Sequence, residues 1–185
     1  KYRLLLEGAK YADRHGFAAV WTPERHFHAF GGLYPNPAVA GAAIAAVTEH
    51  VQIRAGSVVL PLHHPIRVAE EWSVVDNLSN GRVGLSFASG WQPNDFVLRP
   101  ANFADAKNVM LRDIDTVRRL GRGDTIEFDG PLGKPVPLRI LPPLFNRYSG
   151  GGSYGRHVDG AVMSQAGMAQ RLLDEFGLTF AEGYG

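Results

Sequence analysis

The chain has 185 residues, 45% hydrophobic and 20% charged, which is enough for one domain with a buried core. A formal net charge of +1 gives no reason to expect nucleic acid or an anionic membrane as a partner. Cysteine is absent, which excludes disulfides and thiolate metal sites and is compatible with a cytoplasmic location. No apolar run approaches the roughly 18 to 20 residues of a membrane span. Because the first residue is Lys1, we expect a partial protein.

Helices and strands are predicted to alternate along the first two thirds of the chain. Apolar periodicity predicts helices over residues 2–15, 37–49, 65–78 and 103–121, and apolar runs predict strands over 17–22, 51–60 and 82–87. Gly16, Gly81 and Gly121 are placed to end helices, whereas Pro37 and Pro65 suit first helical positions. The short connections predict an α/β fold of right-handed βαβ units with a parallel sheet.

This rhythm stops after Gly123. Residues 125–130 are typical of one arm of a small hairpin, and residues 131–143 contain five of the twelve prolines, which predicts an extended surface segment. A glycine-rich break follows at 149–153, and residues 161–176 favour one more amphipathic helix.

Each predicted strand ends in residues suited to a flat ligand. The first strand is followed by an acid, a guanidinium and two imidazoles: Glu24, Arg25, His26 and His28. The second contains the small residues Gly56, Ser57 and Val58 and leads to two more imidazoles, His63 and His64. The third ends in small residues and an indole, followed by an amide: Ala88, Ser89, Gly90, Trp91 and Asn94. Neighbouring parallel strands bring such ends to one edge of a sheet. Small residues there admit a planar ring. Arg25 could neutralise an anion, and His26 could shift protons.

Other interpretations stay open at this point. His26 and His28 after a strand are a plausible pair of metal ligands, so a metal-dependent hydrolase of the TIM-barrel type is an alternative. No third histidine or strand-end aspartate is evident downstream to complete that set. Glu24 with Arg25 could be a local ion pair, and His63 with His64 could simply line the entry to a helix.

Several blocks, in this order and spacing, resemble the bacterial luciferase-like flavin monooxygenases, in the branch found in natural-product assembly lines. They are Trp21 to Phe27, Asn36-Pro37, Val59-Leu60-Pro61 with His64 to Arg67, Asp76 to Arg82, and Ala88 to Trp91. The resemblance covers residues 1–142. It implies a (β/α)8 TIM-type barrel, here incomplete, that binds reduced FMN as cosubstrate, activates O2 and oxygenates an organic substrate. It also implies a small-molecule or carrier-bound substrate, a separate flavin reductase and a possible homodimer.

The resemblance also assigns residues. Glu24, Arg25 and His26 match a Glu-His-His segment and are the expected catalytic residues, although Arg25 stands where relatives have a histidine. Flavin contacts are expected from Ser57 and Val58, a pair joined by a cis peptide in relatives, and from four residues after the third strand: Ala88, Ser89, Gly90 and Trp91. Ala88 replaces a reactive cysteine and Ser89 an arginine near the phosphate, so the light reaction is not implied. No metal is expected.

The remaining residues, 143–185, are predicted to be a tail of uncertain fold with a faint similarity to an acyl-adenylating domain. Because the resemblance covers less than half of a typical barrel, we expect this chain alone to bind FMN poorly or not at all. The departures at Arg25 and Ala88 leave a non-catalytic flavin-binding or vestigial protein as a third alternative.

Overall fold

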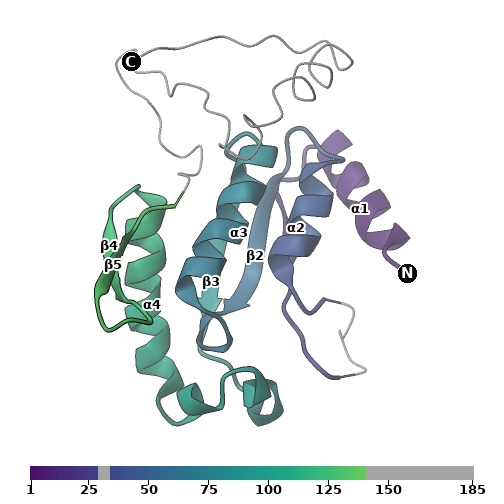
Figure 1. Cartoon of the computed structure of the whole chain (residues 1–185). Helices are drawn as coiled ribbons and strands as arrows, with labels where there is room; N and C mark the ends of the chain where they lie inside the picture. The colour runs from purple at the N-terminus through teal and green to yellow at the C-terminus, as the bar shows by residue number, and fades with distance from the viewer. Residues whose placement is uncertain (29–33, 141–185) are drawn as a thin grey trace, which may run out of the picture. The chain divides into compact units, whose positions relative to one another are not determined.

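Three parallel strands form the main sheet, and the chain crosses between them through helices (Figure 1). The computed structural model describes residues 1–28 and 34–140, which lie within the unit Lys1–Asn146. The strands are β1 (Ala19–Thr22), β2 (Gln52–Val59) and β3 (Val83–Ala88), in that spatial order, and both pairings are parallel. The predicted α/β class with parallel βαβ units is therefore confirmed.

Four α-helices of the described part pack on this sheet and on one another: α1 (Arg3–Arg14), α2 (Pro37–Ala45), α3 (Pro65–Leu78) and α4 (Ala106–Gly121). Helix α2 contacts β2 and α3, and α3 in turn contacts β3 and α4, as Figure 1 shows for the helices along β2. The core between them contains Ile44, Ile53, Trp72, Val75 and Leu120, all almost fully buried. Burial of these apolar side chains is the main stabilising contribution to the unit.

Two side chains form hydrogen bonds with backbone groups near the amino-terminal ends of the strands. The Asp13 carboxylate accepts hydrogen bonds from the backbone N–H groups of Glu49 (2.9 Å), His50 (2.7 Å) and Val51 (2.7 Å), directly before β2. The Arg82 guanidinium donates to the carbonyl oxygens of Thr48, Val51 and Ser79, each at 2.7 Å. Backbone groups between the elements are thus satisfied by side chains, as buried polar groups require.

The helix predicted over 37–49 is shorter than expected, because α2 ends at Ala45. It begins as predicted: Asn36 Oδ1 accepts from the N–H groups of Ala38 (2.9 Å) and Val39 (3.1 Å). At its other end, Thr48 donates its hydroxyl to Ile44 O at 2.8 Å. This contact pairs a carbonyl of the last helical turn, and the contacts of Asp13 and Arg82 pair the backbone of residues 48–51 outside a helix.

Two further boundaries differ from the prediction. Phe103 lies in a 3₁₀ segment, Pro100–Asp105, and α4 begins after it at Ala106. Gly121 lies within α4, and the helix is ended by Gly123, whose φ of 82° is the left-handed conformation that glycine adopts readily. Gly16 (φ 71°) ends α1 as predicted, and Asn80 (φ 55°) with Gly81 (φ 82°) ends α3.

A separate two-stranded antiparallel ribbon consists of β4 (Ile126–Asp129) and β5 (Pro135–Leu138). The predicted hairpin arm is confirmed, but its partner strand lies in the proline-rich segment that was predicted to be extended surface. Proline cannot donate to a ladder, and it is tolerated here because β5 has a neighbour on only one side.

The predicted glycine-rich break, the helix over 161–176 and the boundary after residue 142 lie outside the described residues and stay predictions. Within residues 1–28 and 34–140, no helix is long and apolar enough to cross a membrane.

Candidate active site

The carboxyl ends of the three strands meet at one edge, as the sequence predicted. In the parallel register, Thr22 pairs with Ala55, and Val59 pairs with Ala88. The loop after β1 contacts the ends of both other strands. Glu24 Oε2 accepts from the backbone N–H of Val59 at 2.8 Å, and the Arg25 guanidinium carbon lies 5.2 Å from the centre of the Trp91 ring.

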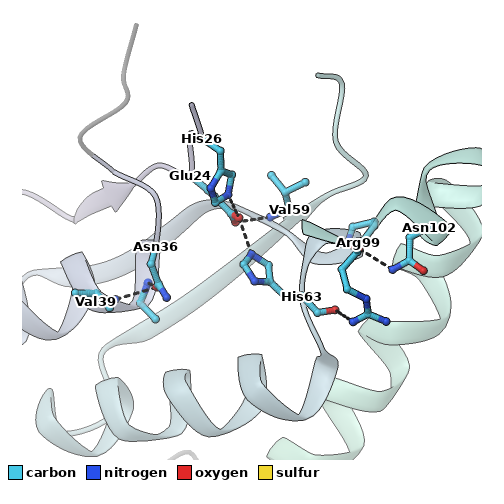
Figure 2. Close-up of polar contacts among 10 residues, drawn as sticks. Glu24, His26, Asn36, Val39, Val59, His63, Arg99 and Asn102 are labelled. Atoms are coloured by element: carbon cyan, nitrogen blue, oxygen red, sulfur yellow. Dashed lines mark hydrogen bonds and ion pairs between the residues drawn. The ribbon is translucent and has the colours of Figure 1, made fainter. Parts of the chain in front are cut away.

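Glu24 is the centre of this edge (Figure 2). Its side chain is fully buried, and its Oε1 contacts two imidazoles, His26 Nε2 at 2.8 Å and His63 Nε2 at 2.5 Å. Burying an ionisable carboxyl group is costly unless it is hydrogen-bonded. Here both of its oxygens have partners, so one carboxyl group joins the loops that follow β1 and β2.

Sequence reasoning placed His63 and His64 after the second strand but gave neither a catalytic nor a flavin-binding role. His63 follows the 3₁₀ turn Leu60–Leu62, whose geometry turns it toward Glu24, while the adjacent His64 caps α3 by accepting from Ile66 N–H at 3.3 Å. Two side chains from the segment after β3 hold this loop by hydrogen bonds to its carbonyl groups. Arg99 donates to His63 O at 3.1 Å, and Asn102 donates to Pro61 O at 2.7 Å (Figure 2). Adjacent histidines therefore have different roles, which their spacing alone does not reveal.

His26 and His28 do not converge as a metal pair would. His28 Nε2 instead lies 3.6 Å from Asp95 Oδ1 and 3.1 Å from Gln92 Nε2, both in the segment after β3. The hydrolase alternative required these two imidazoles to share one ion, and the structure gives it no support. Donor atoms of Glu24, His26 and His63 do lie within 4.8 Å of one another, a cluster that their mutual hydrogen bonds already account for.

The end of β2 is irregular around the small residues. Between Ala55 and Val58 the register with β3 shifts, and the peptide bond Gly56–Ser57 is cis. The cis bond implied for Ser57 and Val58 therefore lies one residue earlier. Gly56 fits there because it has no side chain: a Cβ would lie 2.8 Å from Trp21 Cε3.

The two predicted flavin-contacting residues of β2 differ in exposure. Ser57 is half-buried, and its Oγ lies 3.0 Å from that of Ser86, a neighbour on β3 that sequence reasoning did not single out. Val58 is only 2% exposed and its side chain belongs to the hydrophobic core. Any contact of Val58 with a ligand would therefore involve its backbone.

The end of β3 presents small residues and one exposed indole. Ala88, Ser89 and Gly90 are half-buried, whereas Trp91 is 74% exposed. Gly90 has a φ of 84°, and a Cβ there would lie 3.0 Å from the Phe96 ring and 3.1 Å from Val59 Cγ1. Only glycine therefore fits this position without displacing its neighbours.

These residues fit a planar redox ring such as a flavin. The small residues of β2 and β3 leave the backbone approachable, the Trp91 indole offers an aromatic face, and the hydrogen-bonded imidazoles belong to loops at the same edge of the sheet. The residues that could hold the ring are Ser57, Ala88, Ser89, Gly90, Trp91 and Arg25. Their contacts with it remain predictions.

Parallel βαβ units with polar groups at the carboxyl ends of their strands are shared by open doubly wound sheets and by (β/α) barrels, and they place this chain among the α/β proteins. The chain belongs to the luciferase-like monooxygenase family, whose model matches residues 1–169. The match continues past residue 142, where the resemblance read from the sequence ends. The family is flavin-dependent, as the sequence implied.

Relatives and solved structures agree with this assignment. The chain is 35% identical over 153 residues to the oxygenase component of the flavin-dependent trigonelline monooxygenase of Acinetobacter baylyi, covering 78% of this chain and 42% of that protein. It is 31% identical over 119 residues to 4-hydroxyprotoasukamycin monooxygenase of Streptomyces nodosus subsp. asukaensis, covering 64% and 32%. The crystal structure of the monooxygenase RslO1 from Streptomyces bottropensis matches with a TM-score of 0.71 and 28% identity, covering 79% and 44%. The chain thus spans less than half the length of these proteins.

Proposed function

We propose that this chain provides the oxygenase site of a monooxygenase that uses reduced FMN and O2 to oxygenate an organic substrate. The observation that supports this most directly is the junction of the three strand ends: Glu24 joins the ends of β1 and β2, and the Arg25 and Trp91 pair joins the ends of β1 and β3. When bound, reduced flavin supplies the electrons and the position at which O2 is activated.

The protein residues bind, orient and handle protons. Ser57, Ala88, Ser89, Gly90 and Trp91 would hold the ring, the first four through their approachable backbone and Trp91 through its indole. Arg25 provides a positive charge for an electron-rich ring. His26, held by Glu24, is the group that accepts or returns a proton next to the substrate. The expected catalytic residues are therefore His26, Arg25 and Glu24, with Glu24 acting through the imidazoles.

The relatives' names support the substrate class and partners that we propose. One relative is named as an oxygenase component, which supports a separate flavin reductase as partner. Another is named for protoasukamycin chemistry, which supports a small-molecule or carrier-bound substrate of natural-product biosynthesis. We propose a cytoplasmic location, where a reductase would deliver reduced flavin, and a homodimer as the working state. Residues 1–142 are proposed as the barrel part and 143–185 as a distinct tail.

The test is an anaerobic titration of the chain with reduced FMN, followed by tryptophan fluorescence. We expect quenching of Trp91, which is exposed at the proposed ring site, and weaker quenching in Trp91→Phe. Because the chain covers 42% of the trigonelline relative, the affinity should be weaker than micromolar. Free N-acetyltryptophanamide corrects for absorption by the flavin. Equal quenching in both proteins, once corrected, would remove the support for this site.

A second measurement separates catalysis from flavin binding alone. Oxygen consumption is followed with NADH, a flavin reductase and FMN, with and without the chain. Reduced flavin that is oxidised without oxygenation returns each O2 as one hydrogen peroxide, with or without the chain, so the assay includes a set of small organic acceptors. A catalytic chain lowers the peroxide yield per O2 with an acceptor that it oxygenates, because one oxygen atom enters the product and the other leaves as water. A full peroxide yield with every acceptor would favour the non-catalytic alternative.

A further inference from the structure

Two imidazoles from different loops share a single carboxylate oxygen. Oε1 of Glu24 lies 2.8 Å from His26 Nε2 and 2.5 Å from His63 Nε2, while Oε2 accepts from Val59 N–H at 2.8 Å. The Glu24 side chain is 0% exposed, the His26 side chain 8% and the His63 side chain 23%. Water therefore has little access to the carboxylate, whose partners among the described residues are these three groups.

The hydrogen atoms of this cluster can be assigned from donor and acceptor chemistry. A backbone N–H only donates, so Oε2 is an acceptor. An ionised carboxylate only accepts, so both imidazoles must donate to Oε1 through Nε2–H. In each ring Nδ1 is then the atom left to exchange a proton. Because Oε1 accepts a hydrogen bond from both rings, the tautomer of each ring is fixed, as when a carboxylate orients a single imidazole.

We propose that His63 is a positioning residue for His26 and that the two imidazoles on Glu24 form a single proton-holding unit. With both rings neutral, the unit bears the one negative charge of Glu24. One added proton at Nδ1 of either ring makes it neutral, and a second would place two cations on one buried anion. Because the Nε2–H groups are present in both forms of each ring, the unit gains or releases one proton without changing its contacts.

The two rings differ in access to solvent. The His63 side chain is 23% exposed and the His26 side chain 8%, so we assign proton exchange with water to His63. The inference deepens the proposed oxygenase site and rests on it for the identity of the reaction. Its geometric content, the two fixed tautomers, does not depend on flavin and can be measured without it.

The test uses the full chain labelled with ¹⁵N in histidine and long-range ¹H–¹⁵N correlation spectra of the imidazoles. In the wild-type chain, above the pH at which the rings are charged, His26 and His63 should both show the Nε2–H tautomer. In Glu24→Gln, Val59 N–H holds the amide oxygen and the amide NH2 faces the rings. Both rings must then accept at Nε2, so both should change to the Nδ1–H tautomer. Signals are assigned with His26→Gln and His63→Gln.

Two other histidines are internal controls for folding. His15 Nδ1 lies 2.7 Å from Tyr11 O, an acceptor only, so His15 should show the Nδ1–H tautomer. His64 Nδ1 accepts from Ile66 N–H at 3.3 Å, so His64 should show Nε2–H. Both should be the same in wild type and Glu24→Gln.

Each result of the tautomer measurement either supports the proposal or contradicts it. A change of tautomer in both rings of Glu24→Gln, with His15 and His64 unchanged, supports the proposal. Unchanged tautomers, or a change in His26 alone, overturn it, because His63 would then not share Glu24. Stoichiometric metal in the purified chain would also overturn it, since metal ligation would replace the two N–H donors. Failure of the flavin titration would count against the proposed function and leave the tautomer result standing.

Discussion

The guanidinium carbon of Arg25 lies 5.2 Å from the centre of the Trp91 ring. Arg25 follows β1 and Trp91 follows β3, so the contact passes over the end of the strand between them. A cation over an indole face is a favourable pairing, worth about 0.5–1 kcal/mol at an exposed site. It joins the two outer loops at the edge where the flavin is proposed to bind.

Removing the Arg25 guanidinium should weaken reduced-FMN binding more than it weakens the fold. For Arg25→Ala we expect the apparent dissociation constant to rise about 3- to 30-fold, equivalent to about 0.6–2 kcal/mol, because a cation beside the electron-rich ring is lost. The anaerobic fluorescence titration measures this. Arg54→Ala is the matched control: Arg54 also lies over an indole, 5.6 Å from the centre of the Trp21 ring, but from within β2. Equal losses in the two variants would refute a special role for Arg25.

Asp13 should stabilise the fold in a pH-dependent way. Desolvation raises the pKa of Asp13, but hydrogen bonds from the N–H groups of Glu49, Val51 and His50, with the nearby His50 charge, outweigh it and lower the pKa to about 2. Since the folded-state pKa lies below the unfolded value near 3.8, the stabilisation is complete above that value and is lost as the pH falls toward 2.

Asp13→Asn should therefore lower the free energy of unfolding by about 1–2 kcal/mol at neutral pH. The difference from wild type should shrink steadily between pH 4 and pH 2, as measured by urea denaturation across that range. Asp115→Asn, an exposed change on α4, should leave stability unaltered. A difference that stayed constant down to pH 2 would exclude the ionised carboxylate as its source.

Arg82 should be intolerant even of lysine. Burial lowers the pKa of Arg82 while the charges of Asp13 and Glu49 raise it, and the guanidinium fork reaches carbonyl groups on two sides. A lysine ammonium cannot span the same acceptors, so buried carbonyl oxygens would lose their donors. We expect Arg82→Lys to lower the free energy of unfolding by about 2–3 kcal/mol, measured with urea. Arg122→Lys, at an exposed ion pair with Asp124, should change it by less than about 0.5 kcal/mol.

Much of this fold could be predicted because its signals are local. The three strands are apolar runs bounded by turn residues, and parallel pairing alone places Glu24, Val59 and Trp91 at one edge. Along a regular strand, side chains alternate between the two faces of the sheet, so inward and outward residues can be predicted by counting. The register shift near Gly56 interrupts this alternation in β2, and the count fails beyond it. This is why Val58, expected at the ligand, lies in the core.

The role of His63 was beyond sequence reasoning for a similar reason. Whether His63 or His64 turns inward depends on the 3₁₀ turn before them and on Arg99, which binds the His63 carbonyl from a distant segment. The proton-handling groups were thus only partly identified from spacing. Helix ends were misplaced where side chains such as Thr48 and Arg82 satisfied the backbone in place of helical hydrogen bonds.

Gly90 should be the least replaceable glycine of the candidate site. Its φ of 84° disfavours any side chain, and a Cβ there would also meet the Phe96 ring at 3.0 Å and Val59 Cγ1 at 3.1 Å. Gly16 separates the two effects, since its φ is 71° and nothing lies within 4 Å of a Cβ built on it. We expect Gly16→Ala to cost about 1–2 kcal/mol for the left-handed backbone alone. Gly90→Ala should cost about 1–3 kcal/mol more, since crowding is added. Urea denaturation of both variants measures the difference, and equal costs would show that Phe96 and Val59 can move aside freely.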